Sequence, residues 1–114
     1  MSPLPPPPVP QRLREMLKDY PEHIQTLQDD LNDVIAKPFK GTPMFEQAIW
    51  ALEGATEEFI QQAREELKAA EASGDPAATA RAEEKISLMR RARLNMGGMP
   101  ELFGYFQDHK GAFE

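Results

Sequence analysis

Apolar residues recur every three or four positions along most of this chain, which is the spacing of amphipathic α-helices. The first two stripes of this kind are Leu13, Met16, Leu17 and Tyr20, followed by Ile24, Leu27, Leu31, Val34 and Ile35. Pro21 lies between them, so it either begins a second helix or kinks a continuous one. Lys37-Pro38 predicts the end of this region, because a residue before proline is disfavoured in the helical conformation.

A long helix is predicted over residues 43–72, where Thr42 is placed to cap and Pro43 to supply the first residue. Ser73-Gly74 is expected to end it. In the first half the apolar positions cover roughly half of the helix circumference, and beyond Ala63 they narrow to a seam. We therefore expect the first half to pack among several helices and the second half to lean on a single partner.

That partner is the helix predicted over residues 76–95, with Asp75 as its cap and Gly97-Gly98 as its stop. The short turn before it requires an antiparallel hairpin, in which the numbers of facing residues sum to roughly 148. The pairings that this register predicts are Phe59 with Met89, Leu52 with Met96, Leu67 with Ala82, and Glu57 and Glu58 with Arg90 and Arg91.

The fold class is therefore all-α, with a long antiparallel helical hairpin packed against N-terminal helices and a short C-terminal helix. We divide the chain into a proline-rich disordered arm (1–10), a single helical domain (11–108) and a frayed C-terminus (109–114). Six of the first ten residues are proline, which predicts an extended, solvated arm. The segment 7–12 also fits a PxxPx[Arg/Lys] pattern that SH3-type grooves accept, although proline-rich arms match it easily.

Composition excludes several classes of chemistry. The 114 residues include no cysteine, so there is no disulfide, thiol nucleophile or zinc–thiolate site. The net charge of −6 disfavours bulk binding to nucleic acid or to anionic membranes. The apolar run from Ala48 to Leu52 is too short to span a bilayer, and the first residues do not resemble a signal peptide. We expect a cytoplasmic protein.

No catalytic constellation is apparent in the sequence. The two histidines, His23 and His109, fall in different predicted elements, and no ExxH pair repeats as a di-iron bundle requires. The chain contains no HExxH, no phosphate-binding glycine loop and no GxSxG elbow. We predict no enzyme activity, no catalytic residue, no metal site and no cofactor.

Trp50 lies about 160° from the predicted hairpin seam on a helical wheel, together with Gly54 one turn later. A tryptophan beside a glycine is a flat platform that suits docking of a second copy or of another protein. The alternative is that the N-terminal helices or the C-terminal segment cover Trp50 within the monomer.

The C-terminal segment is the most aromatic part of the chain, and Pro100 is placed to open a short helix there. Leu102, Phe103 and Phe106 share one side of it. This side either folds back over Phe45 and Ile49, which we favour, or inserts into a partner. The predicted partner-binding residues are Trp50, Gly54, Leu102, Phe103 and Phe106.

The function that these features favour is a non-catalytic helical interaction or adaptor module, acting through self-association as a homodimer or through binding of a partner helix. The alternative is a regulatory nucleic-acid-associated protein that uses the basic face of the helix over 76–95. The register directs much of that face toward glutamates of the preceding helix, so nucleic acid is the less favoured partner. The basic residues concerned are Arg81, Lys85, Arg90, Arg91 and Arg93.

Overall fold

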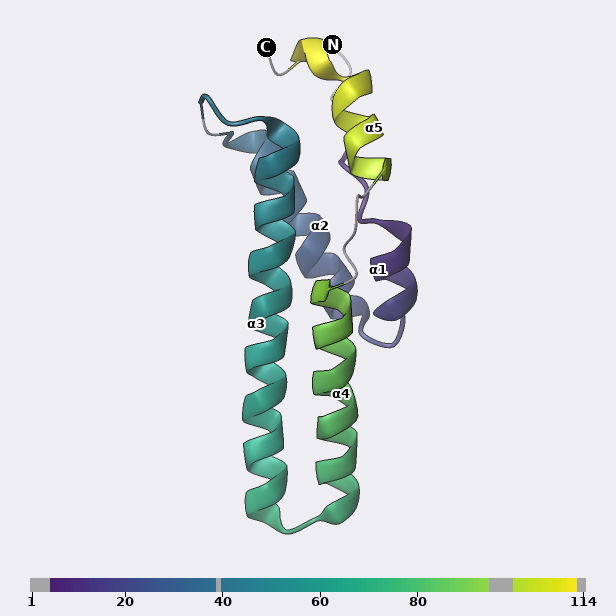
Figure 1. The fold of residues 1–114 in the computed structure, drawn as a ribbon, viewed down its shortest axis with the longest axis vertical. Helices are drawn as coiled ribbons and strands as arrows, with labels where there is room; N and C mark the ends of the chain where they lie inside the picture. Colours follow the sequence, from purple (N-terminus) through teal and green to yellow (C-terminus); the bar gives the residue numbers. More distant parts are fainter. Residues whose placement is uncertain (1–4, 39, 95–99, 113–114) are drawn as a thin grey trace.

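The computed structural model describes residues 5–38, 40–94 and 100–112, and these contain helices and no strand. The all-α prediction is confirmed. The elements, drawn in Figure 1, are α1 (Gln11–Met16), α2 (Pro21–Ala36), α3 (Met44–Ser73), α4 (Pro76–Leu94), α5 (Pro100–Asp108) and the 3₁₀ turn η1 (Lys110–Ala112).

The molecule is elongated, with principal extents of 56 × 24 × 24 Å. The antiparallel pair α3 and α4 extends alone at the lower end of the view in Figure 1, whereas α2 and α5 lie beside the upper part of α3 and α1 lies beside the upper part of α4. Helix α3 packs against α4, α2 and α5, and α1 touches α4.

The turn of the hairpin follows the predicted chemistry. Gly74 has a φ of 72°, the left-handed conformation that glycine adopts without strain, and it ends α3. The carboxylate of Asp75 accepts the N–H groups of Ala77 and Ala78 at 3.0 and 3.4 Å, which confirms the predicted cap.

The predicted start of α3 is wrong by one residue. Pro43, with a ψ of 139°, is the N-cap itself, and no side chain caps the helix. Because Pro43 is still extended, Thr42 lies outside the cap position. Its carbonyl oxygen instead accepts the side-chain amide of Gln47 at 2.8 Å.

Salt bridges agree with the predicted register to within one helical turn, although Glu57 pairs with Arg93 and not with the predicted Arg90 or Arg91. Lys85 pairs with Glu66 at 2.9 Å, and Arg93 pairs with Glu53 at 3.2 Å and with Glu57 at 3.5 Å. Each pair lies within one helical turn of the predicted facing positions, since long side chains lean toward the N-terminus of their own helix. Phe59 and Met89 both lie in the core, and the expected partner of Leu52, residue 96, lies outside the described residues.

The N-terminal helices are separate. Pro21 is the first residue of α2 and Tyr20 is its N-cap, so the two-helix alternative holds and the single kinked helix does not. Lys37 is the C-cap of α2, directly before Pro38, as predicted.

The largest difference from the predicted fold is in the proline-rich arm, which was expected to be solvated but is partly buried. Pro7, Val9 and Pro10 are buried, and Val9 is only 2% exposed. The carbonyl of Pro7 accepts the side-chain amide of Gln28 at 2.8 Å, and the carbonyl of Pro5 accepts the Tyr105 hydroxyl at 2.6 Å. Proline lacks a backbone donor but keeps its acceptor, and its fixed φ lowers the entropy lost on packing. Residues 5–10 therefore belong to the folded body.

Helix α5 returns to the start of the hairpin, as the favoured alternative predicted. The rings of Phe103 and Phe45 meet edge to face with centroids 5.5 Å apart. The carboxylate of Glu101 accepts the backbone N–H of Gln11 at 2.8 Å, so a negative charge sits at the N-terminus of α1. Of the segment expected to fray, residues 110–112 form η1, and residues 113–114 lie outside the described chain.

Candidate docking surfaces

Trp50 is exposed on α3, with 56% of its surface accessible to solvent. Neither the N-terminal helices nor α5 covers it, so the intramolecular alternative for this residue is wrong. Gly54 is also exposed, one turn along the same helix. A Cβ added to Gly54 would meet no atom within 4 Å, so no intramolecular contact requires a glycine there.

Trp50 borders a groove of 420 Å³ between α2 and α3, which we call the Trp50 groove. Helix α3 contributes the indole, and the C-terminal half of α2 contributes carboxylates and an aliphatic side chain. Its lining residues are Asp30, Asp33, Val34, Lys37, Gln47, Trp50 and Ala51.

The Trp50 groove is lined by two carboxylates and one ammonium group, and the carboxylates are not paired. Asp30 and Asp33 are three residues apart on α2, so they project from the same side of the helix. Neither forms a salt bridge within the described part of the chain. Partial burial, and then repulsion from Asp33 and Asp29, raises the pKa of Asp30. A cation placed here would relieve that repulsion.

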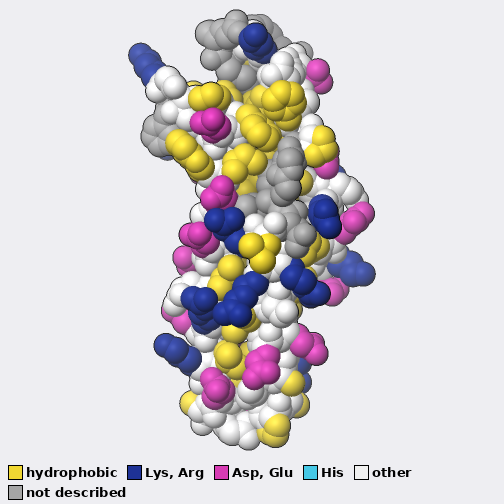
Figure 2. Space-filling view, in the orientation of Figure 1, with side chains coloured by type: hydrophobic (Ala, Val, Ile, Leu, Met, Phe, Trp, Pro, Cys, Tyr) yellow, Lys and Arg dark blue, Asp and Glu magenta, His cyan; other side chains and the backbone are white. Residues whose placement is uncertain are grey.

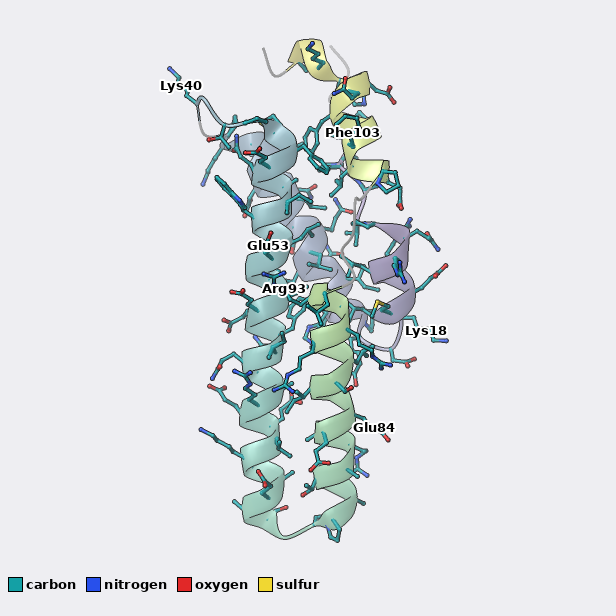
Figure 3. All side chains as sticks on the ribbon, in the orientation of Figure 1. Lys18, Lys40, Glu53, Glu84, Arg93 and Phe103 are labelled. Atoms are coloured by element: carbon teal, nitrogen blue, oxygen red, sulfur yellow. The ribbon has the colours of Figure 1, made fainter. Side chains whose placement is uncertain are left out.

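A second hollow of 620 Å³ lies between α5, the first turn of α3 and the loop before it; we call it the α5 cleft. Phe103, half exposed, extends from α5 toward α3, while Lys40 points away from the molecule at the loop tip (Figure 3). Apolar side chains gather over this part of the surface (Figure 2). The residues lining the cleft are Pro38, Lys40, Gly41, Thr42, Pro43, Met44, Phe45, Glu46, Phe103, Phe106, Gln107 and Lys110.

The predicted contact residues thus divide into two groups. Trp50, Gly54 and Phe103 are accessible, whereas Leu102 is fully buried and Phe106 is 7% exposed. The amphipathic pattern of α5 identified its apolar side but not which residues of that side remain open. Leu102 and Phe106 contribute to the core of this chain, and they are available to a partner only if α5 detaches.

The basic surface of α4 is partly neutralised. Arg93 of α4 pairs with Glu53 of α3, which is labelled beside it in Figure 3, and with Glu57. Lys85 pairs with Glu66, and its ammonium sits 4.9 Å from the centre of the Tyr20 ring. Lys and Arg side chains nevertheless cluster over the middle of the hairpin in Figure 2. Leu94, beside this cluster, is 80% exposed, a feature that the sequence analysis missed.

His23 lies apart from both hollows. Its ring stacks between those of Tyr20 and Phe59, with centroids 5.6 and 4.0 Å away, and its Nε2 has no hydrogen-bond partner among the described residues. Burial, followed by the positive charge of Lys85, lowers the pKa of His23. The ring of His109 contacts that of Tyr105 on α5 at a tilt of 53°, so the two histidines occupy different sites.

Within residues 5–38, 40–94 and 100–112, no group of three or more histidine, aspartate or glutamate side chains is arranged to hold a metal ion. None of the described helices combines the length and the apolarity that crossing a membrane demands. Comparison with protein-family models, with curated proteins and with solved structures finds no match to this chain.

Proposed function

We propose that this protein is a non-catalytic helical interaction module that docks a protein, either a second copy or another chain, through the Trp50 groove. The observation that carries the proposal is the 56% exposure of Trp50 beside a groove of 420 Å³. Tryptophan is enriched among the residues that dominate binding energy at protein interfaces, because its large rigid ring loses little entropy when it is covered.

The α5 cleft is a second candidate docking surface, and the support for it is weaker. Phe103 is half exposed there, but its ring already contacts Phe45, so part of its apolar surface is used within the chain. Trp50 has no ring contact of this kind with the described residues. The Trp50 groove is therefore the better candidate for a docking surface.

The nucleic-acid alternative receives less support from the structure. Arg93 and Lys85 both pair with glutamates of α3, which lowers the positive charge that α4 offers to phosphates. The nucleic-acid alternative can be tested directly, because contacts with phosphate weaken steeply as the salt concentration rises. Retention on immobilised DNA or RNA at low salt that is lost as salt rises would favour it over docking through Trp50.

The proposed function is tested with Trp50→Ala and with Leu94→Ala as the matched control, since Leu94 is an exposed apolar residue outside the groove. Solution mass is measured by light scattering after size exclusion over a dilution series, and proteins captured from cell extract are compared by mass spectrometry. We expect Trp50→Ala to weaken association by about thirtyfold, the effect of a typical interface hot spot, and Leu94→Ala to change little. Unchanged mass and unchanged captured proteins in Trp50→Ala would overturn the proposal.

A further inference from the structure

The charges around Trp50 restrict what can cover it. Asp30 and Asp33 line the same groove, and neither has an oppositely charged partner among the described residues. If two copies met through this face about a twofold axis, the carboxylates of both copies would be brought together. Like charges placed opposite one another disfavour such a contact. The symmetric dimer through Trp50 is therefore the least favoured occupant.

We propose that the Trp50 groove receives an arginine side chain from a basic segment of a partner protein. This inference rests on the proposed function, because it names the chemistry of the partner that docks there. Its basis is the combination of an exposed indole and two unpaired carboxylates in one groove.

Arginine fits the groove better than lysine does. Its planar guanidinium stacks on an aromatic face and at the same time donates two parallel hydrogen bonds to a carboxylate. Trp50 supplies the face, and Asp30 and Asp33 supply the acceptors. Val34 and Ala51 line the same groove and offer apolar surface to the aliphatic stem. A lysine ammonium is more strongly hydrated and lacks the paired donor geometry.

A bound cation would also reduce the repulsion among the carboxylates of α2. Asp29, Asp30 and Asp33 repel one another, and Lys37 is the basic side chain among the groove's lining residues. Lys37 does not form a salt bridge with either groove carboxylate. A guanidinium bound between the indole and the carboxylates would thus form ion pairs that none of the described residues forms with Asp30 or Asp33.

Binding in the groove can be followed by the fluorescence of the chain itself. Trp50 is the only tryptophan in the chain, so intrinsic tryptophan fluorescence reports on this groove alone. The probe is a short arginine–alanine peptide, titrated into the 114-residue chain. The comparison peptide carries citrulline, which keeps the shape of arginine without its charge.

A pair of double variants separates local from global charge. Asp30→Asn with Asp33→Asn removes the groove carboxylates, and Glu65→Gln with Glu71→Gln removes the same charge from exposed positions on α3 that lie outside the groove. We expect the arginine peptide to bind saturably, the groove variant to weaken binding by about tenfold, and the control to change it less than about twofold. High salt should weaken binding to the unmodified chain.

Equal weakening by both double variants, or equal binding of the citrulline peptide, would overturn the inference, because binding would then follow net charge or shape alone. No fluorescence response to the arginine peptide, with Trp50→Ala still altering association, would refute the arginine inference and leave the interaction role in place. If Asp30→Asn with Asp33→Asn abolishes self-association of the chain, the groove is occupied by the basic α4 surface of a second copy. The proposal of a separate partner protein would then be refuted.

Discussion

The two ends of the α3–α4 hairpin are built from the same pair of helices but are stabilised differently. At the open end, which comprises the first half of α3 with α1, α2, α5 and residues 5–10, α3 is surrounded by several elements. At the distal end, residues 64–81, α3 and α4 pack mainly against each other, and Tyr20, the N-cap of α2, borders them beside Ala78 and Arg81. No residue between Ala63 and Ala82 is buried.

The difference follows from the width of the apolar arc along α3. In the first half, small and large apolar residues extend around the helix, and Ala48, Leu52 and Phe59 are all buried there. In the second half only a seam remains, with Leu67 half-buried. A helix with a wide apolar arc packs against several neighbouring helices, because each contact removes apolar surface from water. A narrow apolar seam is covered by a single neighbouring helix. Distal stability therefore depends on the Asp75 cap, on helix propensity, on the partly buried Leu67 and on the Lys85–Glu66 salt bridge.

The largest expected effect is the contrast between two identical substitutions at the two ends. Leu52→Ala removes a fully buried side chain at the open end and should lower the free energy of unfolding by about 3 kcal/mol. Leu67→Ala, in the distal seam, should cost about 1 kcal/mol, since the side chain is only partly buried and alanine favours the helix. Urea unfolding followed by circular dichroism measures both, and equal losses would mean that the two ends are packed alike.

A smaller effect tests whether residues 5–10 belong to the open end. Val9→Ala removes two methyl groups from a buried site and should destabilise the protein by about 2 kcal/mol. The matched control is Val34→Ala, at a half-buried position in α2 where better helix propensity offsets part of the loss. If Val9→Ala costs less than about 0.5 kcal/mol in the same urea experiment, the segment is solvated, as its composition first suggested.

The smallest effect concerns His23, whose ring stacks on Phe59 of α3 with Lys85 of α4 nearby. Because burial and Lys85 lower the pKa of folded His23 below its unfolded value of 6.5, the unfolded chain binds a proton more readily. This contribution to stability is complete above pH 6.5 and is lost as the pH falls toward the lowered pKa. Glu22 on α2 and Glu66 on α3 oppose the shift without reversing it.

His23→Phe keeps a stacking ring and removes the titrating group. We expect the urea midpoint of the unmodified chain to fall between about pH 7.5 and pH 5.5, and that of His23→Phe to fall less. The raised pKa of Asp30 has the opposite effect on stability at lower pH, but it is present in both proteins and cancels in the comparison. Identical pH dependence in the two chains would rule out His23 as its source.

Sequence reasoning succeeded where local signals decide the structure. Helix periodicity, the Asp75 cap and the left-handed Gly74 act within a few residues, so the hairpin and its register followed directly from them. The burial of Val9 was missed because a proline-rich composition does not show that a distant amide and hydroxyl will bind its carbonyl groups. Such pairing depends on how α2 and α5 are placed in space.

The candidate site was only partly predictable for the same reason. A helical wheel placed Trp50 away from the seam, but it could not show whether α2 or α5 would cover the indole. The neighbourhood of Trp50, Asp30 and Asp33 arises from the packing of α2 on α3, two elements whose contact no local pattern specifies. Likewise, the division of α5 into buried Leu102 and exposed Phe103 required its position against α3.

The contacts of α5 with the start of the chain impose an order on biosynthesis. Glu101 binds the N–H of Gln11 across 90 residues, and Tyr105 binds the carbonyl of Pro5 across 100. The hairpin, whose turn is local, closes a short loop and can form early, whereas contacts of high sequence separation form slowly. A nascent chain must therefore extend past Tyr105 before Pro5 and Gln11 meet these partners, and until then chaperones and proteases encounter a hairpin with an unfinished upper half.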